Sequence, residues 1–173
     1  MIMTGTLSVA DQLAIRDVIS RYAWALDTGD VDGFVACFCS DGVLLWDAFE
    51  TPDRWQGHAA LRHFACFFRD LPSSAGRQHH VTNTLVSASG AGASAKSYVA
   101  VALRQEEGPH LLNVMGYYED RFRHEEGEWR IAERVIRDWS GPVLRNFAGQ
   151  SGARVARPRP MPLQGALHVP GAR

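Results

Sequence analysis

Apolar residues recur at helical spacing in the first part of the chain and alternate with polar residues in the second part. The first apolar stripe predicts a helix over Val9–Thr28, with Ser8 as its N-cap and Gly29 just beyond its end. The next expected elements are a short helix at Val31–Phe38, a turn at Ser40–Gly42, a strand at Val43–Asp47, a loop at Glu50–Gln56 and a third helix from Gly57 to about Leu71.

The period changes after a turn-rich connector at Pro72–Arg77, and the alternation that follows predicts strands. Helices followed by a run of long strands are typical of α+β proteins, in which the helices pack on one face of an antiparallel sheet. The expected strands are Gln78–Ala88, Ala93–Gln105, His110–His124 and Glu128–Trp139, joined by glycine-containing hairpin loops.

A change of composition beyond Trp139 divides the chain into two parts. Residues 1–140 have the length of one domain with one core. Residues 141–173 are rich in proline, arginine and glycine and have no periodicity, so we expect a C-terminal arm and no second domain. The arm is either disordered or an ordered segment that packs on a pocket mouth or on a neighbouring subunit.

The composition argues against several classes of function. The net charge of −1 leaves no basic excess for nucleic acid, and the apolar runs are far shorter than the roughly 20 residues that span a bilayer. Without a secretory pattern at the N-terminus, and with Cys37, Cys39 and Cys66 at no disulfide spacing, we expect free thiols in a cytoplasmic protein. There is no phosphate loop, dinucleotide fingerprint or metal-ligand spacing, so we expect no cofactor and no metal.

One carboxylate and one imidazole are candidates for acid–base chemistry. Asp27 lies near the end of the first helix among apolar neighbours, where an unpaired carboxylate is costly; the alternative is a solvated residue at the helix end. Neighbouring side chains of a strand point to opposite faces, so only one of His79 and His80 faces inward. His79 alternates with Val81 and Asn83, which favours it as an inward general base; the alternative is a hydrogen-bonded structural histidine.

Further side chains are candidates for completing or lining such a site. Arg134 is in phase with apolar residues of the last strand, so it needs an anion nearby, either a carboxylate or a negative charge that develops on a substrate. Five tryptophans are many for this length, and one or two of them are expected to line a pocket for a flat, apolar ligand. The remaining candidates are Tyr22 as a hydrogen-bond donor, and Tyr118, Trp24, Trp46, Asn83 and His80 as substrate-binding residues.

Over about residues 8–140, the motifs resemble the SnoaL-like branch of the nuclear-transport-factor-2-like superfamily. The resemblance implies a cone-shaped α+β barrel, in which N-terminal helices pack on a curved, mainly antiparallel sheet that encloses a pocket. The segments that carry it are Ala14–Asp32, Phe38–Val43, Gln78–Asn83, Gly116–Asp120 and Glu128–Arg134.

Within this superfamily the pattern is similar to scytalone dehydratase, bile-acid 7α-dehydratase and hexachlorocyclohexane dehydrochlorinase, which eliminate without a cofactor. The resemblance places their aspartate at Asp27 and their catalytic histidine at His79. It also places the tyrosine of the bile-acid enzyme at Tyr22 and the arginine of the dehydrochlorinase at Arg134.

Two hypotheses follow. In the first, a cofactor-independent lyase, or a related isomerase or cyclase, removes a proton from a small apolar cyclic substrate with His79, which Asp27 orients. Residues 98–102 lack the second acid or histidine of the dehydratases, so the second proton donor is Tyr22, Tyr118 or water. In the second hypothesis, the same cone is a non-catalytic ligand-binding or assembly subunit.

The resemblance also implies a homo-oligomer, because the outer face of the sheet must be covered. We expect a trimer, with a dimer as the alternative, since the long C-terminal arm resembles those of trimeric members. Its end, Gly165–Gly171, is similar to the terminus of the dehydrochlorinase.

Overall fold

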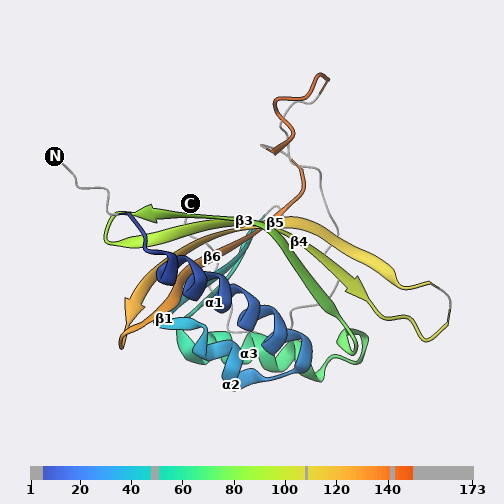
Figure 1. The fold of residues 1–173 in the computed structure, drawn as a ribbon. Helices are drawn as coiled ribbons and strands as arrows, with labels where there is room; N and C mark the ends of the chain where they lie inside the picture. Colours follow the sequence, from blue (N-terminus) through green and yellow to red (C-terminus); the bar gives the residue numbers. More distant parts are fainter. Residues whose placement is uncertain (1–5, 48–50, 108, 141–142, 150–173) are drawn as a thin grey trace.

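The computed structural model describes residues 6–47, 51–107, 109–140 and 143–149. Helices α1, α2 and α3 lie together against one face of a bent sheet, so the expected α+β architecture is confirmed (Figure 1). The elements are α1 (Val9–Thr28), α2 (Val31–Ala36), β1 (Phe38–Asp47), β2 (Asp53–Gln56), α3 (Gly57–Asp70), the 3-10 helix η1 (Pro72–Ser74), β3 (Gln78–Ser89), β4 (Gly92–Leu103), β5 (Leu111–Glu125) and β6 (Glu128–Asp138).

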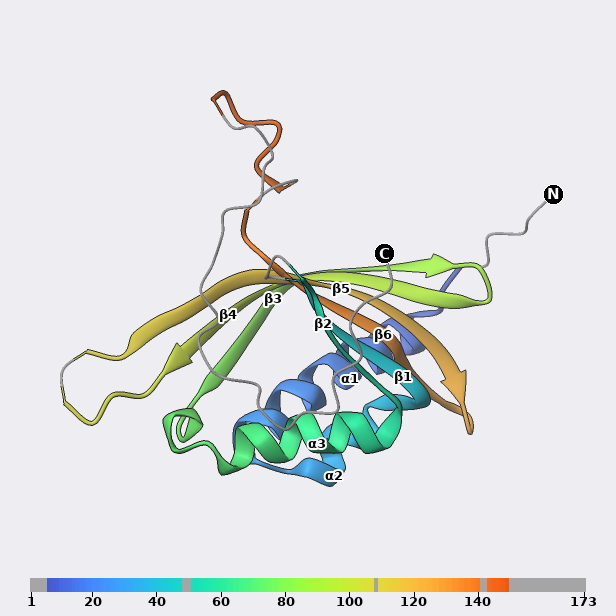
Figure 2. The ribbon, with the colours of Figure 1, turned by 180° about the vertical axis from the view of Figure 1, so that it is seen from behind.

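The six strands form one sheet in the order β2-β1-β6-β5-β4-β3. β1 and β6 pair in parallel, and all the other neighbours are antiparallel, which confirms the expected mainly antiparallel sheet. The strands curve over the helices, as the view from behind also shows (Figure 2). β2 and β3 are therefore the two edge strands.

Two expectations for the segment between α2 and α3 are wrong. The loop expected up to Gln56 contains β2, which pairs with β1 and is anchored by the buried side chains of Asp53 and Trp55. The turn expected at Ser40–Gly42 lies inside β1, which begins at Phe38 and carries a register irregularity before Val43. A strand that bulges can contain turn-type residues without ending there.

Helix α1 is fixed at both ends by its own sequence. Ser8 and Asp11 form a capping box, in which each side chain accepts a hydrogen bond from the backbone N–H of the other residue at 3.1 Å. The Asp11 carboxylate also accepts a 2.9 Å bond from the Trp129 indole, which ties the helix to β6. At the other end Gly29 adopts φ 75°, a left-handed conformation that glycine takes without strain.

An aromatic core fills the space between the helices and the sheet. Tyr22, Phe34, Phe38, Trp55 and Phe64 are all almost fully buried. Their rings contact one another in offset and edge-on arrangements, with centroids 4.8 to 5.9 Å apart. This packing holds the last turns of α1 rigidly against the sheet.

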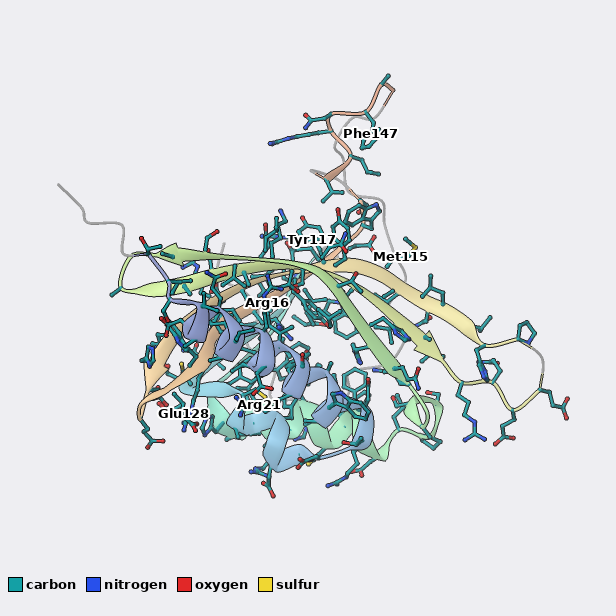
Figure 3. All side chains as sticks on the ribbon, viewed as in Figure 1. Arg16, Arg21, Met115, Tyr117, Glu128 and Phe147 are labelled. Atoms are coloured by element: carbon teal, nitrogen blue, oxygen red, sulfur yellow. The ribbon has the colours of Figure 1, made fainter. Side chains whose placement is uncertain are left out.

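The C-terminal arm falls mostly on residues 150–173, which lie outside the described residues, so the predicted boundary at residue 140 stays a prediction. Within the described part, Phe147 is exposed and lies beyond the sheet, on the side away from the helices (Figure 3). Cys37 and Cys39 are buried free thiols and Cys66 is a half-buried one. No helix in the described part is both long and apolar enough to cross a membrane.

Candidate active site

Asp27 and His79, which are 52 residues apart in the chain, meet through two hydrogen bonds. One carboxylate oxygen, Oδ1, lies 2.5 Å from the ring nitrogen Nδ1 of His79. The other, Oδ2, accepts a 2.7 Å bond from the backbone N–H of the same residue. The two side chains are 15% and 7% exposed, so the pair is largely shielded from water.

The edge position of β3 explains this arrangement. Each strand residue directs its backbone N–H to one side of the strand. On an edge strand, the N–H groups that point away from the sheet have no neighbouring strand to which they can donate a hydrogen bond. The outward N–H of His79 is taken by Asp27, which the last turn of α1 places beside the edge. The carboxylate therefore holds both the backbone and the ring of His79.

The contact determines which ring nitrogen is available for chemistry. A carboxylate accepts hydrogen bonds, so Nδ1 carries the proton and Nε2 of a neutral imidazole is left with its lone pair. No hydrogen bond to Nε2 is present in the described part of the chain. The pair can thus act as a base at Nε2, with Asp27 stabilising the imidazolium that forms.

His79 borders an inner cavity between the helices and the sheet, with a volume of about 50 Å³. Arg77 and Asn113 add polar groups to a wall that is otherwise largely apolar and aromatic. Tyr118 and Trp46 line this cavity, and their role in substrate binding stays a prediction. The other lining residues are Tyr22, Leu26, Phe64, Phe68, Val99, Val101, Val114 and Ile136.

Two tyrosines close the bottom of the cavity. Tyr22 and Tyr118 are almost fully buried and meet edge-on, with ring centroids 6.0 Å apart. The Tyr22 hydroxyl is buried and makes no hydrogen bond within the described part of the chain. Burial raises the pKa of Tyr22 to about 12 and holds the pKa of Tyr118 well above its usual value. Both phenols therefore remain neutral donors at physiological pH.

Arg134 was expected to face either a carboxylate or a substrate, and the structure shows the carboxylate. Its guanidinium makes bonds of 2.8 and 2.7 Å to the two oxygens of Asp120, and both side chains have no exposure to solvent. Arg134 is not among the cavity-lining residues, and its expected role in stabilising a developing anion stays a prediction. The guanidinium carbon lies instead 4.0 and 4.2 Å from the ring centroids of Tyr22 and Tyr118, beneath the cavity.

Three expected binding residues lie outside the inner cavity. Trp24 and His80 are exposed and line a groove of about 600 Å³ between α1 and β3. Asn83 was expected to share the face of His79, and this is wrong. The register of β3 shifts between Thr82 and Leu85, and Asn83 takes φ 52° and is exposed, because a bulge ends the simple alternation there.

Arg77 is a site residue that the sequence analysis assigned to a connector. It lines both the inner cavity and the outer groove, together with His79. The available signal was its position two residues before His79, since residues i and i+2 of an extended chain share a face. No group of three or more metal-ligating side chains exists among the described residues.

The model of the SnoaL-like domain matches residues 8–135. The chain belongs to the SnoaL-like domain family. No curated protein matches the sequence.

Solved structures share the SnoaL-like fold of this chain. A protein of unknown function from Mycobacterium tuberculosis is 27% identical over 84% of each chain, with a TM-score of 0.67. A proposed aromatic ring hydroxylase from Novosphingobium aromaticivorans is 28% identical, over 76% of this chain and 91% of that one, with a TM-score of 0.65. A proposed scytalone dehydratase from the same organism is 21% identical, over 75% and 85% of the two chains, with a TM-score of 0.60, which shows the fold alone.

Proposed function

We propose that this SnoaL-like protein is a cofactor-independent lyase, or a related isomerase or cyclase, that acts on a small apolar cyclic substrate. The observation that carries the proposal is the 2.5 Å contact between Asp27 and His79 at the wall of an apolar cavity. A base held by a second group, beside a largely apolar cavity, is the usual arrangement for proton abstraction from carbon.

In the proposed reaction, Nε2 of His79 takes a proton from a carbon next to a carbonyl or to the carbon that bears a leaving group. The electrons of the C–H bond form a double bond, and a hydroxide or halide leaves with its electron pair. Asp27 stabilises the imidazolium, and the unpartnered Tyr22 hydroxyl donates a hydrogen bond to the departing group or to an enolate oxygen. In an isomerase or cyclase the proton returns to the substrate at another atom, or the new carbanion closes a ring.

Turnover by matched variants tests this proposal. Hydroxylated and halogenated cyclic compounds are incubated with the protein, and loss of water or halide and exchange of carbon-bound hydrogen in D₂O are followed. We expect His79→Gln to lose roughly 10²–10⁴-fold in rate, the usual contribution of a general base. We expect a smaller loss for Asp27→Asn, and none for His124→Gln, whose exposed ring packs on Trp129.

Equal rates for wild type and His79→Gln on a turned-over compound would refute the assignment of the base. Binding of cyclic compounds with neither elimination nor hydrogen exchange would favour the second hypothesis, a non-catalytic binding or assembly subunit.

We also propose that the protein forms a homo-oligomer, with a trimer preferred over a dimer. Met115 and Tyr117 lie on the sheet face away from the helices, where Tyr98 and Trp139 contact each other (Figure 3). Met115 is 55% and Tyr98 is 45% exposed, which leaves apolar surface for a second copy to cover. Light scattering at micromolar concentration checks this, and a monomer mass would contradict it.

A further inference from the structure

Arg77 is a buried cation whose hydrogen bonds are incomplete. The residue is 9% exposed and lies between η1 and the start of β3. Nη2 donates a 3.0 Å bond to the Ser74 hydroxyl, and the guanidinium carbon lies 4.7 Å from the ring centroid of Phe68. The Nε group is buried and has no partner. A guanidinium presents five N–H donors, and the bond to Ser74 is the one hydrogen bond that the Arg77 side chain makes within the described residues.

The charge of Arg77 is also not neutralised by direct contact. Within the described ranges, no carboxylate lies within the 4.0 Å of its guanidinium that defines an ion pair. Burial lowers the pKa of Arg77, and the negative charge of Asp27 opposes this effect. The Asp27 carboxylate is already hydrogen-bonded to His79. The fully buried Arg134, by contrast, has both oxygens of Asp120. A buried, unpaired cation costs free energy unless an anion joins it.

The position of Arg77 shows where such an anion would lie. Arg77 and His79 are two residues apart on the same face, and both border the inner cavity and the outer groove. In extended backbone this spacing separates the two Cα atoms by about 6 to 7 Å. The apolar rings of Phe64 and Phe68 form the wall beyond them. A single small molecule that lies in the outer groove and reaches into the inner cavity can therefore place one carbon near His79 and a charged group near Arg77.

We propose that Arg77 binds a carboxylate of the substrate, and that the substrate class is small cyclic carboxylic acids. The naming of a substrate rests on the proposed function; the anion site itself does not. The planar fork of a guanidinium matches the two oxygens of a carboxylate, and the largely apolar wall of the neighbouring cavity offers few competing polar groups. Arg77 thereby selects anionic over neutral ring compounds and orients the ring toward His79.

Binding of matched probe pairs tests the anion site without any turnover. The probes are benzoate and cyclohexanecarboxylate, each paired with its uncharged primary amide, and affinity is measured by calorimetry or by ligand-detected NMR. We expect wild type to bind the acids at least tenfold more tightly than the amides. Arg77→Met should lose this preference while keeping its affinity for the amides, and Arg77→Lys should retain part of it. Arg121→Met, which removes an exposed cation from β5, should behave as wild type.

A thermal melt separates the binding role from a structural one. Because no carboxylate among the described residues pairs with the charge of Arg77, we expect Arg77→Met to melt at the same temperature as wild type or higher. No preference of wild type for the acids, or an unchanged preference in Arg77→Met, would overturn the proposal. So would a lowered melting temperature of Arg77→Met combined with equal losses for acids and amides.

The proposed anion site at Arg77 and the proposed base at His79 can be refuted separately. His79→Gln should keep the preference for acids, because Arg77 remains in place. If the preference depends on Arg77 but no compound is turned over, the anion site stands and the proposed reaction fails. If neutral rings are turned over by His79 and acids are not preferred, the reaction stands and the anion site fails.

Discussion

Arg134 and Asp120 face each other in register on β6 and β5 and form a two-bond ion pair with no exposure to solvent. The guanidinium also lies against the rings of Tyr22 and Tyr118, which form the bottom of the cavity. The pair thus supports the cavity from below without contacting its contents.

Breaking this pair should destabilise the fold strongly. Asp120→Asn leaves a buried guanidinium without its counter-charge, and we expect a loss of about 3–5 kcal/mol in the free energy of unfolding. The double variant Asp120→Leu/Arg134→Met should recover most of that loss, because it buries no charge. Urea unfolding measures both effects, with Arg121→Met as a control at an exposed ion pair worth less than about 1 kcal/mol. A loss below about 1 kcal/mol for Asp120→Asn would show that the pair is not buried as described.

The buried phenol of Tyr22 predicts a loss of stability in alkali. Its pKa is raised by burial to about 12 in the folded protein, whereas an unfolded tyrosine ionises near pH 10. Below pH 10 both states are neutral, and above it only the unfolded state gains the charge, so the free energy of unfolding falls as the pH rises from about 10 to 12. The share of Tyr22 in this fall is about 2–3 kcal/mol.

Urea unfolding of wild type and Tyr22→Phe between pH 8 and 11.5 checks this share. We expect a shallower decline for Tyr22→Phe, and no loss at pH 8, since the missing hydroxyl makes no hydrogen bond to any described residue. Tyr98→Phe, at a ring that is 45% exposed, should decline as wild type does. Identical slopes for wild type and Tyr22→Phe would contradict the burial of this group.

The first turn of α1 depends on its cap. Ser8→Ala removes the side-chain acceptor for the Asp11 N–H, and we expect about 0.5–2 kcal/mol of destabilisation in urea or thermal unfolding. Ser20→Ala, on the exposed face of the same helix, should change stability by no more than about 0.5 kcal/mol. Equal effects of the two substitutions would mean that the cap contributes nothing specific.

The sequence predicted α1 to its bounds because both ends carry local signals, a capping serine and a left-handed glycine. It missed β2, because four residues that pair only with β1 show too little alternation to be separated from a loop. Local pattern also could not place Asn83, since the bulge in β3 depends on its pairing with β4.

The candidate site also contains contacts that the sequence indicates and contacts that depend on strand register. The contact between Asp27 and His79 was implied by the family resemblance, whereas alternation on β3 indicated only that one of His79 and His80 faces inward. The partner of Arg134 was not predictable, since Asp120 faces it only through the register of β5 with β6. The alternation that places His79 on an inward face extends to Arg77, two residues earlier. Arg77 was missed because it lies in a segment whose composition predicts a turn.

The most direct test of the central claim is the protonation of the His79 ring, observed by long-range ¹H–¹⁵N NMR of the folded protein at neutral pH and slightly above. We predict that the neutral form of the ring carries its proton on Nδ1 and presents a bare Nε2, and that Asp27→Asn disturbs this tautomer. A proton on Nε2 of the neutral wild-type ring, or a spectrum that Asp27→Asn leaves unchanged, would contradict the account.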